Sequence, residues 1–177
     1  MQKVKLVEPA KELYEAYLDF YQEWIHSGEV RIPWVIDKYP YDIEKMLTFF
    51  DEHKKGIDLP EGWVPDSTYW LINEQEQVLG VVNIRHQLTD YLMNIGGHIG
   101  YGIRPSQRQK GYATQLLRLS IEEASKLGIK KILVTCDKNN IASWKTILKN
   151  NGVEYKDFIE ENGNVVKRFW IEGKQTL

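Results

Sequence analysis

The sequence has little cysteine, no excess of positive charge and no long apolar run. Cys136 is the single cysteine among 177 residues, so no internal disulfide can form and a reducing compartment is expected. A formal charge of -2 provides no global positive field for generic nucleic-acid binding. No segment reaches the roughly 20 apolar residues of a membrane-spanning helix, and residues 1–8 lack the apolar core of a secretory signal. These absences predict a cytoplasmic protein with no membrane span and no nucleic-acid partner.

What is present is the composition of one globular domain. Hydrophobic residues make up 42% and charged residues 27%, which suits a sizeable core and excludes disordered and collagen-like chains. No internal repeat or low-complexity tract interrupts the chain. We therefore expect a single domain over residues 1–177.

The spacing of apolar residues predicts an α+β fold. Helical spacing is found at residues 10–26, 41–55, 111–127 and 140–151. Strand patterns are found at residues 3–7, 68–72, 78–86, 93–104, 129–136, 154–160 and 165–171, with Asn162-Gly163 as a hairpin turn. This order of elements favours a mixed sheet with helices packed against it over a regular β/α alternation.

The predicted strand 93–104 is unusual because it contains Gly96, Gly97, Gly100 and Gly102. Glycine within a strand indicates a bulge or the close approach of another group to the backbone. We expect one of these two features here.

A basic turn links this strand to the helix that starts near Gly111. No acidic residue occurs between Asp90 and Glu122, whereas Arg104, Arg108, Lys110 and Arg118 all do. Small residues in a first helical turn let an anion reach the unpaired N–H groups there. The segment therefore predicts an anion site, with a solvated surface turn as the alternative. It matches neither the P-loop nor the dinucleotide-binding glycine pattern.

Residues 108–113, Arg-Gln-Lys-Gly-Tyr-Ala, resemble the Arg/Gln-x-x-Gly-x-Gly/Ala signature of the GNAT N-acetyltransferases. Ile103-Arg104-Pro105 precedes the signature at the family's spacing, and a strand followed by Asn140 comes after it. Residues 97–101 and 136–141 look more narrowly like a bacterial subgroup known mainly as predicted acetyltransferases. The resemblance covers nearly the whole chain. It implies a GNAT-like mixed, mostly antiparallel sheet of six to seven strands with helices on both faces.

The resemblance also implies that acetyl-CoA is a co-substrate and that no metal is needed. The signature would hold the pyrophosphate of coenzyme A through backbone N–H groups, and Ile103 would bind pantetheine as a neighbouring strand would. The residues implied for this cofactor are Ile103, Arg108, Gln109, Lys110, Gly111, Tyr112, Ala113, Thr114, Asn140 and Ser143. Asn140 has a second interpretation, because asparagine is a favoured helix N-cap.

The implied reaction is attack of an amine on the acetyl thioester. It needs a base, an oxyanion donor and an acid for the departing thiolate. His98 is the first candidate for the base, because it lies on the strand of Ile103 and its ordinary pKa suits neutral pH. His86, Glu61 and a water relay are the alternatives. A backbone N–H group at residues 101–103 would serve as the oxyanion donor.

The acid is where the sequence departs from the family. Leu148 stands where many members carry a tyrosine, and Val153 replaces the aromatic residue that commonly follows the nearby glycine. Tyr101, Tyr112 and Tyr155 are possible substitutes. The acid stays unassigned, and Tyr101 is retained as a catalytic candidate.

The predicted function is transfer of an acetyl group from acetyl-CoA to a primary amine, on a small molecule or a peptide, in a ternary complex. Residues expected on the acceptor side are Trp24, Trp34, Asp37, Tyr39, Tyr41, Asp42, Glu61, Trp63 and Asp66. Aromatic and acidic groups would suit a cationic amine.

Three further interpretations stay open. The chain could be an acyl-CoA-binding module of this fold that has lost catalysis and acts as a sensor or partner domain. It could instead be a transferase that uses a longer acyl or an aminoacyl donor. The terminal hairpin could support a homodimer.

Overall fold

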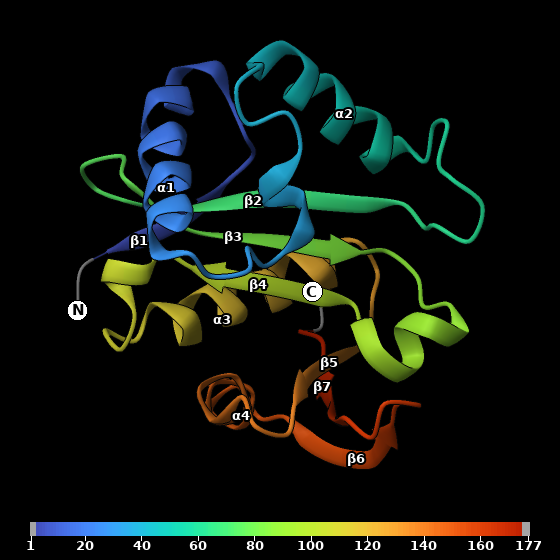
Figure 1. Cartoon of the computed structure of the whole chain (residues 1–177). Coiled ribbons are helices and arrows are strands. Elements are labelled where there is room, and N and C mark those ends of the chain that lie inside the picture. Colours follow the sequence, from blue (N-terminus) through green and yellow to red (C-terminus); the bar gives the residue numbers. More distant parts are fainter. Residues whose placement is uncertain (1–2, 175–177) are drawn as a thin grey trace.

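The structure is a computed structural model that describes residues 3–174 (Figure 1). Residues 1–2 and 175–177 lie outside the described residues. They belong to the expected single domain over 1–177, and residues 1–2 also begin the segment 1–8 that was considered as a secretory signal. The strands are β1 Val4–Val7, β2 Asp66–Asn73, β3 Val78–Arg85, β4 Ile99–Ile103, β5 Lys131–Asp137, β6 Val153–Ile159 and β7 Val165–Glu172. The α-helices are α1 Tyr14–Ser27, α2 Ile43–Lys55, α3 Tyr112–Lys126 and α4 Ile141–Lys149.

The strands form two antiparallel sheets, which confirms the α+β class. The larger sheet has the order β1-β2-β3-β4 and the smaller one the order β5-β7-β6. α1 and α2 cover one face of the larger sheet, and α3 covers the other (Figure 1). α4 lies beside the smaller sheet. Within residues 3–174, no helix combines the length and the apolar character needed to cross a membrane.

The helices bury the stripes that their spacing predicts. In α1 the buried side chains are Tyr17, Phe20, Tyr21 and Trp24, which recur every three or four residues. Gly28 ends the helix with a φ of 68°, the left-handed conformation typical of a glycine after the last turn. The aromatic stripe packs on the larger sheet, where the rings of Tyr17 and Trp70 stack at 4.6 Å.

The prediction of a strand over residues 93–104 is wrong in its first half. Leu92–Gly96 form a single π-helical turn, and β4 begins only at Ile99. Gly97 turns the chain between them with a φ of 63°, a conformation that side-chain-bearing residues rarely adopt. Of the two features expected from the glycines, the close approach is confirmed, because a Cβ on Gly97 would lie 2.7 Å from the Leu133 carbonyl oxygen.

A second close approach fixes the loop between α1 and α2. A Cβ on Gly102 would lie only 1.8 Å from the carbonyl oxygen of Ile32. No side chain fits at that position, so this loop rests directly on the backbone of β4.

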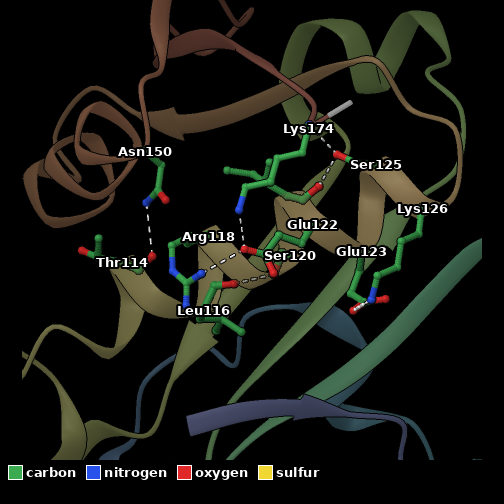
Figure 2. Close-up of polar contacts among 11 residues, drawn as sticks. Thr114, Leu116, Arg118, Ser120, Glu122, Glu123, Ser125, Lys126, Asn150 and Lys174 are labelled. Carbon is green, nitrogen blue, oxygen red and sulfur yellow. Dashed lines mark hydrogen bonds and ion pairs between the residues drawn. The ribbon is translucent and has the colours of Figure 1, made fainter. Parts of the chain in front are cut away.

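The first turn of α3 is tied to the end of α4 (Figure 2). Asn150 Nδ2 donates a hydrogen bond to the carbonyl oxygen of Thr114 at 3.3 Å. Farther along α3, Glu122 pairs with Lys174 at 2.6 Å and with Arg118 at 2.9 Å. The bonds of Asn150 and Lys174 tie α3 to the end of α4 and to the segment after β7, whereas the Arg118–Glu122 pair lies within α3.

We expect Gly102→Ala to lower the free energy of unfolding by about 2–4 kcal/mol, because the added methyl group displaces the Ile32 carbonyl. Gly163→Ala is the control. It has no atom within 4 Å of its Cβ and a φ of +85°, so only backbone strain of about 1 kcal/mol applies. Urea unfolding of both variants checks this. If Gly102→Ala and Gly163→Ala lowered the free energy of unfolding equally, the loop between α1 and α2 would not rest on β4.

Candidate active site

β4 and β5 lie beside each other but are joined only at one end. The N–H group of His98 donates to the Leu133 carbonyl oxygen at 2.7 Å. The N–H group of Leu133 donates in turn to His98 Nδ1 at 2.9 Å. Among the described residues no ladder continues from this junction, so the two strands belong to different sheets. We call the stretch between the two strands beyond this junction, where the described residues form no ladder, the gap.

The outer edge of β4 turns peptide groups toward this gap that form no ladder with β5 within residues 3–174, although the Ile103 carbonyl oxygen accepts a hydrogen bond from Arg108 Nε. Arg104 donates its N–H group across the β3–β4 ladder to the carbonyl oxygen of Leu79 at 2.8 Å. Alternate residues of an antiparallel strand face its partner, so the peptide groups of Ile99, Tyr101 and Ile103 face outward. An extended ligand can pair with such an edge as a further strand does.

The edge leads into a turn that fits an anion. Gln109 and Gly111 have φ values of 60° and 85°, in the left-handed region found in anion-binding turns. The first turn of α3 contains no acidic residue, and its N-cap, Gly111, has no side chain that could cap the helix. The positive end of the helix dipole at Gly111 therefore suits an anion, as a pyrophosphate requires.

No acidic residue lies near the turn in the sequence, but acidic residues of α1 contact it in the structure. Arg104 pairs with Asp19 and Glu23 of α1. Glu23 also accepts a hydrogen bond from the N–H group of Ser106 at 2.6 Å. Burial acts to raise the pKa of Glu23, but the hydrogen bonds from Ser106 and Arg104 lower it overall. This carboxylate anchors the turn to α1.

Arg108 is held in the same way. Its guanidinium pairs with Glu29 at 2.8 Å, lies 4.9 Å from the centre of a Trp24 ring and donates through Nε to the Ile103 carbonyl oxygen at 3.3 Å. Lys110 donates to Gln107 Oε1 at 3.0 Å and forms no ion pair with the described residues. Of the signature's two cations, Lys110 is thus the one without a carboxylate partner within residues 3–174.

Tyr101 brings its hydroxyl to the start of α4. The hydroxyl lies 2.9 Å from Ser143 Oγ. Burial raises the pKa of Tyr101 to about 12, so the phenol keeps its proton at neutral pH. Asn140 caps α4 by accepting a hydrogen bond from the Ser143 N–H group at 3.1 Å, which confirms its N-cap role. These three predicted residues meet where the gap faces α4.

Leu148, which occupies the family's tyrosine position, differs in its surroundings from the other candidate acids, Tyr112 and Tyr155, and from the cysteine. Leu148 is 46% exposed on α4, and Tyr155 is 44% exposed on β6. Tyr112 is buried at the start of α3. Burial raises the pKa of the Cys136 thiol to about 11, so it is a poor nucleophile at neutral pH.

The three candidate bases differ in surroundings. His98 is buried, and burial together with the charge of Arg85 lowers its pKa to about 4. His86 Nε2 lies 2.9 Å from Ser67 Oγ, and burial lowers the pKa of this histidine as well. Glu61 is exposed. The assignment of His98 as the base stays a prediction, and Nδ1 already accepts the hydrogen bond of the junction.

A cavity of about 450 Å³, here called the β2–β3 cavity, opens over the ends of β2 and β3. Its lining includes Trp34, Glu61, Trp63, Asp66, Asn83 and Arg85. The first four were expected on the acceptor side.

The remaining acceptor-side predictions take other positions. Asp37 pairs with Arg31, and Asp42 caps α2 by accepting a hydrogen bond from the Lys45 N–H group at 3.1 Å. Trp24 belongs to the core. Tyr39 and Tyr41 are exposed and are not among the residues that line the β2–β3 cavity.

A buried polar cluster forms the floor of this cavity. Asp66 Oδ2 lies 2.8 Å from His53 Nδ1, and Asp66 Oδ1 accepts a hydrogen bond from Asn83 Nδ2 at 2.6 Å. The sequence analysis did not identify His53, Asn83 or Arg85 as site residues. Asn83 and Arg85 could have been found from the sequence, because they are two polar residues at alternating positions of an otherwise apolar strand.

A larger hollow, of about 780 Å³, is lined by residues such as Arg118, Lys149 and Trp170. None of its lining residues lies on β4, so it does not adjoin the gap through that strand. Among residues 3–174, no group of three or more histidine, cysteine or acidic side chains is placed to hold a metal ion.

Comparison with known proteins gives one family. The sequence pattern of the acetyltransferase (GNAT) domain matches residues 4–153. No curated protein matches the sequence significantly.

Solved structures share the fold at low sequence identity. A ribosomal-protein-S5-alanine acetyltransferase from Vibrio fischeri has a TM-score of 0.67 and 14% identity, over 97% of this chain and 93% of that one. A ribosomal L7/L12 α-N-protein acetyltransferase in complex with coenzyme A has a TM-score of 0.67 and 14% identity, over 97% and 95%. An N-acetyltransferase from Staphylococcus aureus has a TM-score of 0.60 and 19% identity, over 97% and 99%.

The junction between β4 and β5 predicts that His98→Ala destabilises the protein by about 1–3 kcal/mol, because the Leu133 N–H group loses its buried acceptor. His98→Asn supplies an amide oxygen to the same donor and should restore much of this loss. Denaturant unfolding measures both. A His98→Asn variant that folds like the wild type but loses turnover, with a changed pH–rate profile, would instead identify His98 as the base.

The pH dependence of stability gives a second readout. The pKa of His98 falls from 6.5 to about 4 on folding, so the unfolded chain takes up this proton first as the pH is lowered. Stability present above pH 6.5 is therefore lost as the pH falls toward 4. The slope approaches about 1.4 kcal/mol per pH unit. His98→Asn should lack this part of the slope.

Proposed function

Because this chain belongs to the GNAT acetyltransferase family, we propose that it transfers an acetyl group from acetyl-CoA to a primary amine in a ternary complex. The observation that carries the proposal is the outward-facing edge of β4, which the turn of residues 104–111 connects to the start of α3. An extended chain ending in a pyrophosphate matches both parts of this surface.

The chain's own groups would hold the co-substrate as follows. The outward peptide groups of Tyr101 and Ile103 would pair with pantetheine, and the N–H groups of the turn at Gly111 would bind the pyrophosphate. Lys110, which has no carboxylate partner among the described residues, would add charge. Asn140 and Ser143 border the gap from α4 and would contact the same ligand.

The acetyl thioester supplies an electrophilic carbonyl carbon and a thiolate leaving group. The amine nitrogen bonds to that carbon, the carbon–sulfur bond breaks, and the nitrogen gives up a proton that His98 or a water relay would take. An outward N–H group of β4 would stabilise the oxyanion, because it is fixed in place before the reaction. His98 joins the strands that bear these donors, which gives it a positioning role.

Tyr101 would donate the proton that the thiolate takes. Its phenol is protonated at neutral pH and its hydroxyl lies against α4, the helix on which Leu148 replaces the family's usual tyrosine. A tyrosine from β4 would thus do what a tyrosine from α4 does elsewhere in the family. This is the observation that favours an enzyme over an acyl-CoA-binding module.

Acetyl-CoA binding tests the first part of the proposal. We expect isothermal titration calorimetry to show selective binding of acetyl-CoA over ATP and NAD. Gly111→Trp should weaken binding at least about tenfold, because a bulky side chain at a φ of 85° obstructs the helix start. Lys126→Gln, on the exposed far end of α3, is the control. Unchanged affinity of Gly111→Trp would place the phosphate site elsewhere.

Turnover tests the role of Tyr101. Tyr101→Phe should lower kcat by about tenfold to a hundredfold, as the loss of a positioned proton donor does, while acetyl-CoA affinity changes little. Single-turnover kinetics with wild type and variant measure the chemical step. Equal rates would exclude Tyr101 as the acid. Ser143→Ala, which removes the hydroxyl's partner and leaves the phenol, should have the smaller effect.

A further inference from the structure

Arg85 is a cation without a carboxylate partner. Its NH1 group donates to the carbonyl oxygens of Gly96 and Gly97, at 3.0 and 3.4 Å, and the described residues offer it no ion pair. Burial lowers the pKa of this guanidinium, although the charge of Asp66 acts in the opposite direction. A buried charge is costly unless an opposite charge meets it. The β2–β3 cavity, which Arg85 lines, is the side from which an anion can come.

The nearest carboxylate is occupied by other groups. Asp66 and Arg85 are cross-strand partners in the β2–β3 ladder. Yet the two oxygens of Asp66 bond to His53 and Asn83, and Asp66 makes no ion pair with Arg85. The floor of the cavity therefore places a positive and a negative group side by side with no ion pair between them, and each oxygen of Asp66 can accept one further hydrogen bond.

Asn83 adds an unused acceptor to the same floor. Its side chain is fully buried, and its Nδ2 donates to Asp66 and to Thr68 Oγ1. Its Oδ1 has no hydrogen-bond partner among the described residues. A buried acceptor without a donor is rare in folded proteins and indicates a missing partner. Since Asn83 lines the cavity, a ligand N–H group would supply that donor.

From these charges we infer that the acceptor is a free amino acid, bound by its carboxylate to Arg85 and by an N–H donor to Asn83 and Asp66. A simple cation would meet the guanidinium of Arg85, and a simple anion would meet Asp66. A compact zwitterion complements both, and the forked guanidinium suits a carboxylate. The inference rests on the proposed acetyltransferase function and replaces the expected cationic amine as its substrate class.

The shape of the cavity agrees with a single amino acid. Trp34 and Trp63 meet edge to face at 4.9 Å on its wall, where an apolar substrate side chain can pack. A volume of about 450 Å³ lies in the range of small-molecule pockets. Arg85 also adjoins β4, since its NH2 group lies 3.3 Å from the position of a Cβ on Gly100. The carboxylate site thus borders the strand of the proposed acetyl transfer.

The test compares matched acceptors in one assay. The purified full-length protein receives acetyl-CoA with each of the common L-amino acids, with their C-terminal amides and with the corresponding decarboxylated amines. Release of coenzyme A and acetylated product are both measured. For the preferred acceptor, we expect kcat/KM of the free acid to exceed that of its amide by at least about tenfold.

Arg85→Gln should bring the ratio of acid to amide close to one, and Arg85→Lys should leave an intermediate ratio. A ratio measured within one variant is insensitive to partial unfolding, which lowers both rates together. Arg118→Gln, an exposed arginine of α3, is the matched control and should keep the wild-type ratio.

The outcomes separate the two proposals. Amides or amines used as well as the acids, with a ratio that Arg85→Gln leaves unchanged, would overturn the amino-acid inference while the acetyltransferase function stands. If no amine is acetylated although acetyl-CoA binds, the proposed function fails and the inference fails with it. A preference for acids that Arg85→Gln does not reduce would overturn the assignment of Arg85.

Discussion

Two hydrogen bonds between His98 and Leu133 set the geometry on which the site depends. They join the large and the small sheet at the start of β4, and beyond them β4 and β5 form no ladder among the described residues. A continuous ladder would have paired the outward peptide groups of β4 and closed the gap. Because the histidine side chain accepts one of the two bonds, the separation of the strands is specified by a side chain as well as by the backbone. Gly97 permits this, since any Cβ there would strike the Leu133 carbonyl.

Most of the fold could be predicted from the sequence because its signals are local. Apolar spacing places all four helices and most strand ends within a few residues, and the Asn162-Gly163 turn is a hairpin turn in the structure. The failure lies at residues 93–98, where apolar residues typical of a strand form a π-helical turn. Gly97 has a positive φ there and lies against the Leu133 carbonyl, a contact with a distant strand. The glycines indicate that such a feature is present, but not at which residue the strand begins.

The site was predicted in part, for a related reason. The turn at Gly111 could be recognised because its glycine and small residues are contiguous. Its charge could not, because the acids that neutralise Arg104 and Arg108 come from α1 and from Glu29 just after it, about 80 residues earlier in the chain. Likewise, Asn83 and Asp66 form one floor only after β2 and β3 pair. Residues that act together across a sheet are separated in the sequence by the hairpin that joins them.

The edge of β4 keeps the same hydrogen-bonding groups over a wide range of pH. Its side chains on the α1 face are the hydrogens of Gly100 and Gly102, and what it presents to the gap is main chain. Peptide N–H groups do not titrate, and their dipoles are the same in mild acid as in mild base. Sensitivity to acidity must therefore enter through titratable groups around the strand, such as His98 at its start. The strand itself presents the same donors and acceptors whether or not those groups are ionised.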